Sequence, residues 1–449
     1  MNTTPRLWTK DYIVFCLTSL LMLFAFYSLV STLPLYLDEY LHATKGQIGL
    51  ILSFYAVGAL LLRPFCGYAL DVWGRKGVFL SGFFIFCLLF GLYQIPSMKL
   101  FAGLAVLGLP LPLIIVSAVR FLHGLSWAIV SSGSQTISVD LVPASRRGEG
   151  IAFFGLSVGI SLAMGPVLGL WLIDYFSAAH LFATTMILSL LSFFAMSFLM
   201  KFPAYRPQRA KINLHMLIEK TSLPISLVNS IFFFANGAIT TFIPIYSKQI
   251  EGVRPASFFF AFALSMAVIR LVSGKMFDRI GSRIPLALGF PTVIIGALLL
   301  AITHGPWLYH ISAILIGMGQ GMIFPCFVAS INNMVRITRR GAANATFSSS
   351  IDVGIGLGII FFGYLADHMG FRVVYAIVAL VYLLSYLVYL LGAEKHYLRN
   401  RLKVEDNLGD GEHKPHHVPV PEPPPPLTTV ELGKQGGGTP AAVGIKNAP

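Results

Sequence analysis

The strongest evidence for the fold is the segment Gly67-Tyr68-Ala69-Leu70-Asp71-Val72-Trp73-Gly74-Arg75-Lys76, because its pattern of Gly and Asp residues occurs twice in the chain. The second copy, Gly274-x-x-x-Asp278-x-x-Gly281, starts 207 residues after the first, and Arg63 recurs as Arg270 at the same offset. Further positions recur at an offset of 193, namely Gly124 as Gly317, Gly148 as Gly341, Gly165 as Gly358 and Asp174 as Asp367. The chain is therefore predicted to consist of two similar halves, with a substrate path where they meet.

Long apolar runs surround both copies. The chain is 56% hydrophobic and 11% charged, far from the roughly 25% charge of a soluble domain. Each run is long enough to cross a bilayer, which takes about 20 residues. The predicted spans are 12–35, 48–69, 78–95, 113–139, 151–173, 179–200, 223–246, 256–277, 284–303, 308–335, 347–366 and 373–391. The fold class is all-α integral membrane, with twelve transmembrane helices in two homologous six-helix bundles around a central cavity.

Basic residues fix the predicted topology. With the N-terminus in the cytoplasm, 21 Lys and Arg fall on the inner side and five on the outer side, the positive-inside pattern. The predicted domains are an N-terminal bundle (1–200), a basic cytoplasmic linker (201–220), a C-terminal bundle (221–395) and a disordered Pro/Gly-rich cytoplasmic tail (396–449). We expect a multi-pass protein of the plasma membrane, specifically a bacterial inner membrane, with both termini cytoplasmic.

One segment breaks the regularity of the repeat. The offset falls from 207 to 193 between the two blocks, so the first half carries about fourteen extra residues, and the region 100–112 is their natural place. Pro110 and Pro112 interrupt the apolar run there. Residues 100–109 are predicted to form an interfacial or re-entrant piece.

Several functional classes are disfavoured. The net charge of +13 lies in short loops between apolar runs, so no nucleic-acid partner is expected. The four cysteines lie in apolar runs without metal-ligand spacing, and the tail histidines are solvated, so no metal is expected. A nucleotide-binding G-x-x-x-x-G-K-[ST] loop is absent from the sequence, which argues against an ATP-driven pump.

The repeated loop also has a predicted chemistry. Gly67 permits close helix approach and Gly74 a tight turn, while Asp71, Arg75 and Lys76 place charge at the membrane face. These residues resemble motif A of the major facilitator superfamily, and Arg120-Phe121-Leu122-His123-Gly124 resembles its motif B. The resemblance implies that Asp71 faces the N-terminus of the eleventh span and that Arg75 pairs with Asp140. Such contacts would hold the outward-facing state closed on the inside.

Two motifs depart from the family pattern. In the second copy, Gly274, Asp278 and Gly281 match, but Ser282 stands at the position of Arg75 and Arg283 follows it, which implies a weaker or differently paired lock. In the fifth span, Gly159, Gly165-Pro166 and Gly169 are similar to motif C of the drug/proton antiporters, the twelve-span branch. Ser161 and Leu170 stand where that pattern has Gly, and tight packing explains the small residues as well.

Polar residues within spans are the candidates for the substrate and proton path. Arg120, His123 and Trp127 share one face of the fourth span, and Asn229 and Asn236 share one face of the seventh. Arg120 is a candidate to bind an anionic group, and His123 is either a packing residue or a proton carrier. The two Asn residues either bind substrate or form hydrogen bonds between helices. Asp352 is the only acid deep in a span, so it is a candidate to carry a proton. Arg63 and Arg270 are expected to snorkel to the inner surface.

The sequence therefore predicts a secondary active transporter working by alternating access, with proton-coupled export of a small organic or drug-like compound. An uptake symporter for a sugar or organic acid is the alternative within this class. A channel or an intramembrane enzyme is disfavoured, since no catalytic constellation is found. The expected partners are a small-molecule substrate and the lipid bilayer, the protein is expected to be a monomer, and the expected energy source is a proton gradient without a cofactor.

Overall fold

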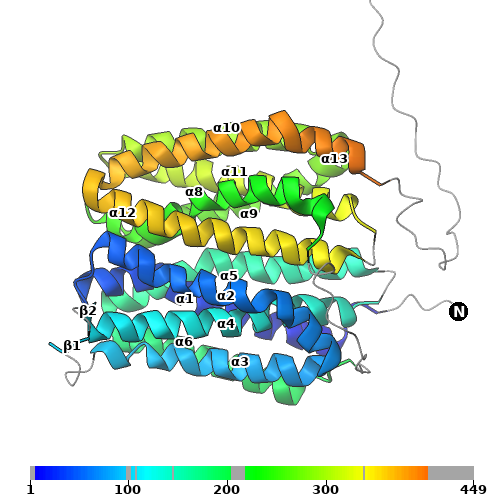
Figure 1. Cartoon of the computed structure of the whole chain (residues 1–449), viewed down its shortest axis with the longest axis horizontal. Coiled ribbons are helices and arrows are strands. Elements are labelled where there is room, and N and C mark those ends of the chain that lie inside the picture. Colours follow the sequence, from blue (N-terminus) through cyan, green and yellow to red (C-terminus); the bar gives the residue numbers. More distant parts are fainter. Residues whose placement is uncertain are drawn as a thin grey trace, which may run out of the picture. The chain divides into compact units, whose positions relative to one another are not determined.

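The computed structural model describes residues 6–97, 103–106, 109–143, 146–203, 218–336 and 339–402. Long helices make up almost all of these ranges (Figure 1). The helices of the first half are α1 (Lys10–Glu39), α2 (Lys45–Val72), α3 (Arg75–Leu92), α4 (Leu111–Asp140), α5 (Arg147–Tyr175) and α6 (Ala178–Leu199). Those of the second half are α8 (Leu223–Ser247), α9 (Pro255–Ile280), α10 (Arg283–Ala301), α11 (Pro306–Asn333) and α12 (Arg340–Val388), followed by η6 (Tyr389–Ala393) and α13 (Glu394–Asn400).

The last helix contains two membrane crossings. Among the described residues, 11 helices are long and apolar enough to span a bilayer, and the last of them runs over the 61 residues Arg340–Asn400. A helix of that length measures about 90 Å, three times the thickness of the hydrocarbon layer. Gly370 breaks it, because its φ of 76° is not helical. The predicted twelve-helix architecture is therefore confirmed.

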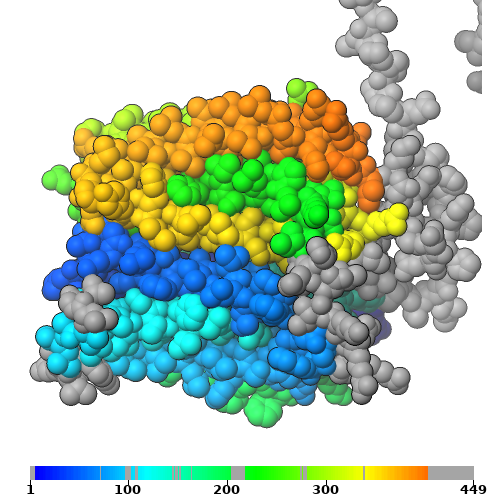
Figure 2. Space-filling model, viewed as in Figure 1, coloured from blue at the N-terminus to red at the C-terminus, as the bar shows by residue number. Residues whose placement is uncertain are grey.

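The helices form two bundles that follow the sequence halves. In Figure 1, α1 to α6 occupy one half of the picture and α8 to α12 the other. The bundles meet where α2 packs along α12, α5 along α9 and α1 along α8. Figure 2 shows the surface of α12 in contact with that of α2 along this boundary. Large apolar side chains such as Leu61, Phe198 and Leu391 are exposed on the perimeter, as expected for surfaces that face lipid.

The two ends of the helices are distinguished by their turns. One end carries the start of α1 and the turns at Gly74 and Gly281, where φ is 97° and 75°, values that favour glycine. We term it the basic end, because the sequence assigns most Lys and Arg to it. The opposite end carries the loop between α1 and α2 and the kink at Gly370.

The described residues of the segment inserted in the first half lie at the opposite end. Its strands β1 (Ala105–Val106) and β2 (Leu109–Pro110) pair antiparallel, and α4 starts directly after them. Residues 98–102, 107 and 108 lie outside the described residues. The described residues thus form a short hairpin and not a re-entrant helix, while their position at the membrane interface stays a prediction. Most of the predicted linker and the tail after Leu402 lie outside the described residues.

Candidate functional site

Two of the three helix pairs that join the bundles are related to each other by the internal repeat. Along the first, α2 packs on α12, and along the second, α9 packs on α5. We term them the α2–α12 line and the α5–α9 line. Arg63 on α2 corresponds to Arg270 on α9 at the offset of 207, and Gly159 on α5 corresponds to Asp352 on α12 at the offset of 193. The same scaffold therefore carries different side chains on its two lines.

A buried ion pair lies at the centre of the α2–α12 line. Arg63 Nε donates to Asp352 Oδ2 at 2.8 Å, and Nη2 lies 2.6 Å from the same oxygen. Arg63 is 7% exposed and Asp352 is 9% exposed. The expectation that Arg63 snorkels to the membrane surface is wrong, because its guanidinium group points into the boundary and finds its counter-charge there. A deep carboxylate needs such a partner, and this was the signal that could have identified Arg63.

The expectation for Arg270 is wrong as well. A Cβ atom added at Gly159 would lie 3.0 Å from Arg270 Nη1, so the guanidinium group lies against the middle of α5 and not at the end of a span. Tyr27 on α1 lies within electrostatic range of Arg270. Arg63 pairs with a carboxylate, whereas its counterpart Arg270 lies against the backbone of α5 at Gly159.

Arg120 adds a further buried cation beside the Arg63–Asp352 pair. Its guanidinium carbon lies 4.6 Å from the centre of the Tyr55 ring, and the residue is 4% exposed. Tyr55 is also within electrostatic range of Arg63 and Asp352. A desolvated cation–π contact contributes about 2 kcal/mol. The described residues nevertheless supply no hydrogen-bond acceptor for Nε and Nη1 of Arg120.

His123 lies inside the N-terminal bundle. Its ring is surrounded by Phe86 at 4.4 Å and Phe90 at 4.8 Å between ring centres, and its Nδ1 lies 3.2 Å from the Tyr93 hydroxyl. These contacts are those of a packed, hydrogen-bonded histidine. Trp127, one turn further along α4, stacks on Phe26 at 4.4 Å and is half-buried.

The two asparagines of the seventh span lie within the C-terminal bundle. Asn229 Nδ2 donates to Ser350 Oγ on α12 at 2.9 Å, and both Asn229 and Asn236 are buried. Thr240 Oγ1 donates to the Asn236 carbonyl at 3.2 Å. The first contact joins helices of one bundle, as an interhelical hydrogen bond should.

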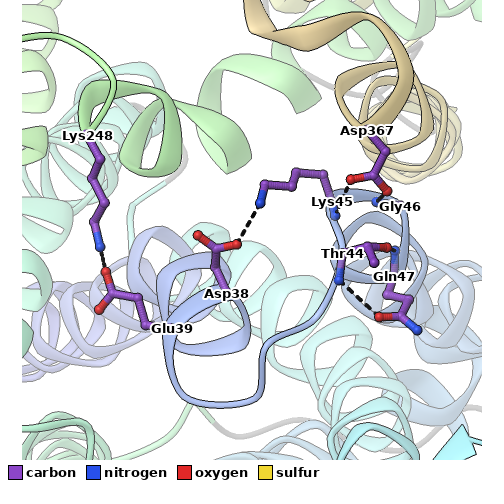
Figure 3. Close-up of polar contacts among 8 residues, drawn as sticks. All are labelled: Asp38, Glu39, Thr44, Lys45, Gly46, Gln47, Lys248 and Asp367. Carbon is purple, nitrogen blue, oxygen red and sulfur yellow. Dashed lines mark hydrogen bonds and ion pairs between the residues drawn. The ribbon is translucent and has the colours of Figure 1, made fainter.

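The opposite end of the α2–α12 line is closed by a carboxylate at a helix N-terminus (Figure 3). Asp367 Oδ1 accepts from the Lys45 N–H at 2.8 Å, and Oδ2 accepts from the Gly46 N–H at 2.6 Å. The start of α2 leaves these donors unpaired within the helix and carries a partial positive charge. A Cβ at Gly49 would lie 2.5 Å from the Ile359 carbonyl oxygen, so the backbones almost touch. The sequence showed Asp367 only as the copy of Asp174 and gave no sign of this role.

Besides the Arg63–Asp352 pair, an ion pair at the opposite end also joins the bundles. Lys248, at the end of α8, pairs with Glu39, at the end of α1 (Figure 3). Lys45 Nζ pairs with Asp38 Oδ1 at 2.9 Å within the first bundle. On the α5–α9 line, Arg254 donates from Nη1 to the Tyr175 hydroxyl at 2.8 Å. The bundles are thus held together at this end on both lines.

Towards the basic end the bundles separate. Gly67 lies one turn beyond Arg63 on the same face of α2, and Gly155 lies one turn beyond Gly159 on α5. A Cβ atom at either glycine would have no heavy atom within 4 Å apart from its own helix and chain neighbours, and both residues are exposed. At these two positions, on the basic side of the arginines, the described residues of the partner helix do not pack against α2 or α5.

The motif A loop places its charges at the basic end. Gly74 begins α3 with a φ of 97°, and Arg75 Nη1 pairs with Asp140 Oδ2 at the end of α4, the partner that the resemblance implies. Lys76 Nζ lies 5.6 Å from the centre of the Phe202 ring. The side chain of Asp71 lies outside the described residues, so its contact with the eleventh span stays a prediction.

The second copy of the loop differs, as its sequence indicates. Arg283 Nε lies 3.5 Å from Glu394 Oε1, and the Arg283 side chain is 80% exposed. Ser282 is buried, with its hydroxyl 3.4 Å from that of Tyr389. Gly281 makes the turn and Gly274 lies within α9, while the side chain of Asp278 lies outside the described residues.

The small residues of the fifth span bring α5 against α1. A Cβ at Gly165 would lie 2.6 Å from Tyr27 Cβ, and Ser28 Oγ donates to the Gly165 carbonyl at 2.8 Å. Gly169 also packs against the backbone of Ser28, and Pro166 lies within the helix. Close packing accounts for Gly165 and Gly169. Gly159 is the exception, since among the described residues its only neighbour within 4 Å of the Cβ position is Arg270.

Comparisons with known proteins agree with this architecture. An MFS-type transporter called YhhS from Escherichia coli K12 is 25% identical over 366 residues, which is 80% of this chain and 87% of that relative. The staphylopine export protein of Staphylococcus aureus Mu50 is 24% identical over 357 residues, or 75% of this chain and 85% of that protein. The structure of a D-xylose-proton symporter superposes with a TM-score of 0.67 at 14% identity, covering 84% of this chain and 96% of that one.

The family is shown by a match along the length of the chain. The sequence model of the family matches residues 15–326 and 256–436, so that both halves are covered. The relatives are MFS-type transporters, and the expectation drawn from the two loop motifs is confirmed at the level of the family. The chain belongs to the Major Facilitator Superfamily.

Proposed function

We propose that this transporter works by alternating access and exports a small organic compound in exchange for protons. The basic end faces the cytoplasm of a bacterial cell in this proposal, because positively charged loops stay on the inner side. Bacterial relatives support such a membrane. With this orientation, the structure corresponds to the inward-open state, in which substrate enters from the cytoplasm.

The Arg63–Asp352 pair is the observation that carries the proposal. It connects two bodies that must move relative to each other, and it lies at the level where their contact ends. Separating the bundles here would leave an ionised Asp352 without a counter-charge, and a charge in hydrocarbon costs several kcal/mol. A proton on Asp352 removes that cost. Protonation and movement are thereby coupled, which is what proton-driven transport requires.

The motif A contacts hold the other state in this proposal. Closing the basic end brings Asp71 on α2 to the start of α12, where a carboxylate is stabilised by unpaired N–H groups. Arg75 and Asp140 orient the loop that presents Asp71. In the inward-open state, Asp367 accepts hydrogen bonds from the corresponding N–H groups at the start of α2. Each state therefore has a carboxylate at a helix N-terminus.

The direction of transport is proposed from one relative. The staphylopine export protein is an exporter by name and matches three quarters of this chain, which favours export. The D-xylose-proton symporter shares the fold alone at 14% identity. Uptake of a sugar or organic acid by proton symport is the second candidate.

Proton flux in proteoliposomes tests the proposal. Purified protein is reconstituted with a pH-sensitive dye inside, and candidate compounds are chosen from those to which expressing cells become resistant. Addition of a transported compound should change the internal pH, and a protonophore should abolish the change. A compound that moves down its own gradient without any proton movement would overturn proton coupling. Accumulation of the compound in expressing cells, in place of depletion, would overturn export.

A further inference from the structure

The α5–α9 line holds a cation without the carboxylate that its counterpart has. Arg270 Nη1 lies 3.0 Å from the position that a Cβ atom on Gly159 would take, and Gly159 is the counterpart of Asp352. Arg270 Nε is buried and has no hydrogen-bond acceptor among the described residues. An arginine that is buried without such acceptors is destabilising, because the lost hydration is not replaced.

The charges around this position do not balance. Tyr27 lies within electrostatic range of Arg270, and Tyr55 within range of Tyr27, Arg63, Arg120 and Asp352. In this connected group the described residues provide three guanidinium groups and one carboxylate. Asp352 is taken by Arg63. A negative group from outside the protein would restore the balance, and the fork of an arginine is suited to bind two oxygens of one carboxylate.

Space and access are provided on the same side. Gly159 has no Cβ, and apart from its own helix and chain neighbours the only described atom within 4 Å of the Cβ position is Arg270 Nη1, so no other side chain covers the guanidinium group there. Gly155, one turn towards the basic end, is exposed with open space at its Cβ position. In the proposed inward-open state, a solute would approach Arg270 from this side.

We propose that Arg270, with the hydroxyl of Tyr27 as a second donor, binds the anionic group of the transported compound, which makes the substrate class an organic anion. The carboxylate or sulfonate of the compound takes the place that the missing acid leaves at Gly159. The proposal rests on the transport function argued above and names the substrate class of that site. Binding of an anion also neutralises the excess positive charge at mid-span.

The first part of the test measures the binding of organic anions to the purified protein. Full-length protein in detergent is titrated with benzoate, succinate, citrate or naphthalene-2-sulfonate at constant ionic strength, and the unfolding temperature reports binding. Sulfate serves as the inorganic anion, and glucose and choline as neutral and cationic controls. We expect at least one organic anion to raise the unfolding temperature of the wild type, and choline and glucose to have no effect.

The decisive comparison is between Gly159→Asp and Gly159→Asn. Both side chains have the same size, so they crowd Arg270 equally, but only Asp can pair with it. Both variants fill the space at Gly159 and should weaken anion binding, but Gly159→Asp should weaken it at least tenfold more than Gly159→Asn, because only the carboxylate neutralises Arg270. Arg270→Gln should weaken binding as Gly159→Asp does.

Two results would overturn the proposal: equal binding by the Asp and Asn variants, or no organic anion that stabilises the wild type, whether or not sulfate does. This binding measurement depends neither on a proton gradient nor on the direction of transport. Arg270-dependent binding without proton flux in proteoliposomes would instead overturn the proposed coupling and leave the anion site in place.

Discussion

The α2–α12 line and the α5–α9 line are two versions of one scaffold. Both bring a pair of helices together at the opposite end, and on both the helices separate just beyond the level of an arginine, at Gly67 and Gly155. On the first line that arginine meets Asp352, and on the second it meets Gly159. The helices pack on both lines, so the scaffold does not require the acid. The difference is consistent with our proposals that Asp352 carries the proton and that Arg270 binds a group supplied by the substrate.

The largest effect is expected from removing Asp352, the proposed proton carrier of the α2–α12 line. Asp352→Asn should abolish gradient-driven transport while substrate binding remains, because the amide keeps the shape and some of the hydrogen bonding but does not titrate. The measurement is substrate-induced proton flux in proteoliposomes at several pH values. Undiminished flux in this variant would remove Asp352 from the mechanism and direct attention to His123 or Asp140.

The matched control is Arg63→Gln, which leaves the acid and removes its partner. A buried charge without its counter-charge costs about 3–5 kcal/mol, so this variant should lose stability in detergent, as Asp352→Asn should by leaving Arg63 without its partner. Unchanged stability of Arg63→Gln would mean that water or another cation replaces Arg63, and the pair would then not couple the bundles.

The next effect concerns closure of the opposite end. Asp367→Ala removes two hydrogen bonds at the start of α2, each made to a charged acceptor, and we expect a loss of about 1–2 kcal/mol from the state closed at that end. This corresponds to roughly a tenfold shift towards the state open there. The counterpart Asp174→Ala should shift it much less, since Asp174 has no such pair of contacts among the described residues.

Cysteine labelling can measure that shift. Ala56 lies at the boundary, where a Cβ at Gly356 would approach its own Cβ to 2.7 Å, and it is buried. With the native cysteines replaced by alanine, Ala56→Cys should react with an impermeant maleimide faster in the Asp367→Ala background than in the Asp174→Ala background. Equal rates in both backgrounds would show that Asp367 does not hold this end closed.

The sequence predicted the scaffold far better than its contacts. The spans followed from apolar runs of membrane length, and the two bundles followed from the repeat, because both signals are local or periodic. Asp352 was identified from its own position, but its partner Arg63 was not, since contacts between α2 and α12 depend on how two distant segments pack. The role of Asp367 was not predicted for the same reason, because an acid at a helix end has no recognisable role until the N-terminus of another helix packs against it.

A smaller effect is expected at the basic end, where the two copies of the loop can be compared. The Arg75–Asp140 pair is partly buried, and the Arg283–Glu394 pair involves a largely exposed arginine. Arg75→Ala should therefore slow transport severalfold, for a loss of about 1 kcal/mol, while Arg283→Ala should change it little. Transport rates at equal expression check this.

The double variant Arg75→Asp with Asp140→Arg separates a pair interaction from two independent effects. If Arg75 acts through Asp140, exchanging the charges should recover some of the rate lost in each single variant. No recovery would mean that Arg75 acts through other groups. Rates unaffected by any of these variants would remove the first copy of the loop from the conformational cycle.

The smallest effect is expected where the halves begin, and it depends on pH. Glu219 lies just before the first helix of the second half, as Thr9, the residue that caps α1, does in the first half. Burial alone would raise the pKa of the Glu219 carboxyl, but hydrogen bonds from the Thr221 N–H and from Arg339 Nε at 2.9 Å together lower it. Thr9 caps its helix with a hydroxyl that does not titrate.

The sign follows from the lowered pKa. A carboxyl whose pKa is lower in the folded protein stabilises the fold above its unfolded pKa of about 4.3, and this stability is lost as the pH falls through the folded value. Arg339 is partly exposed, so solvent screening limits the effect to about 1 kcal/mol. Glu219→Gln should thus lower the unfolding temperature at pH 6–7 and lose that effect below about pH 4. Thr9→Ala should lower it by an amount independent of pH, because its lost hydrogen bond carries no charge. A pH-independent difference for Glu219→Gln as well would show that the carboxylate of Glu219 acts only as a hydrogen-bond acceptor and that its pairing with Arg339 contributes nothing to the second half.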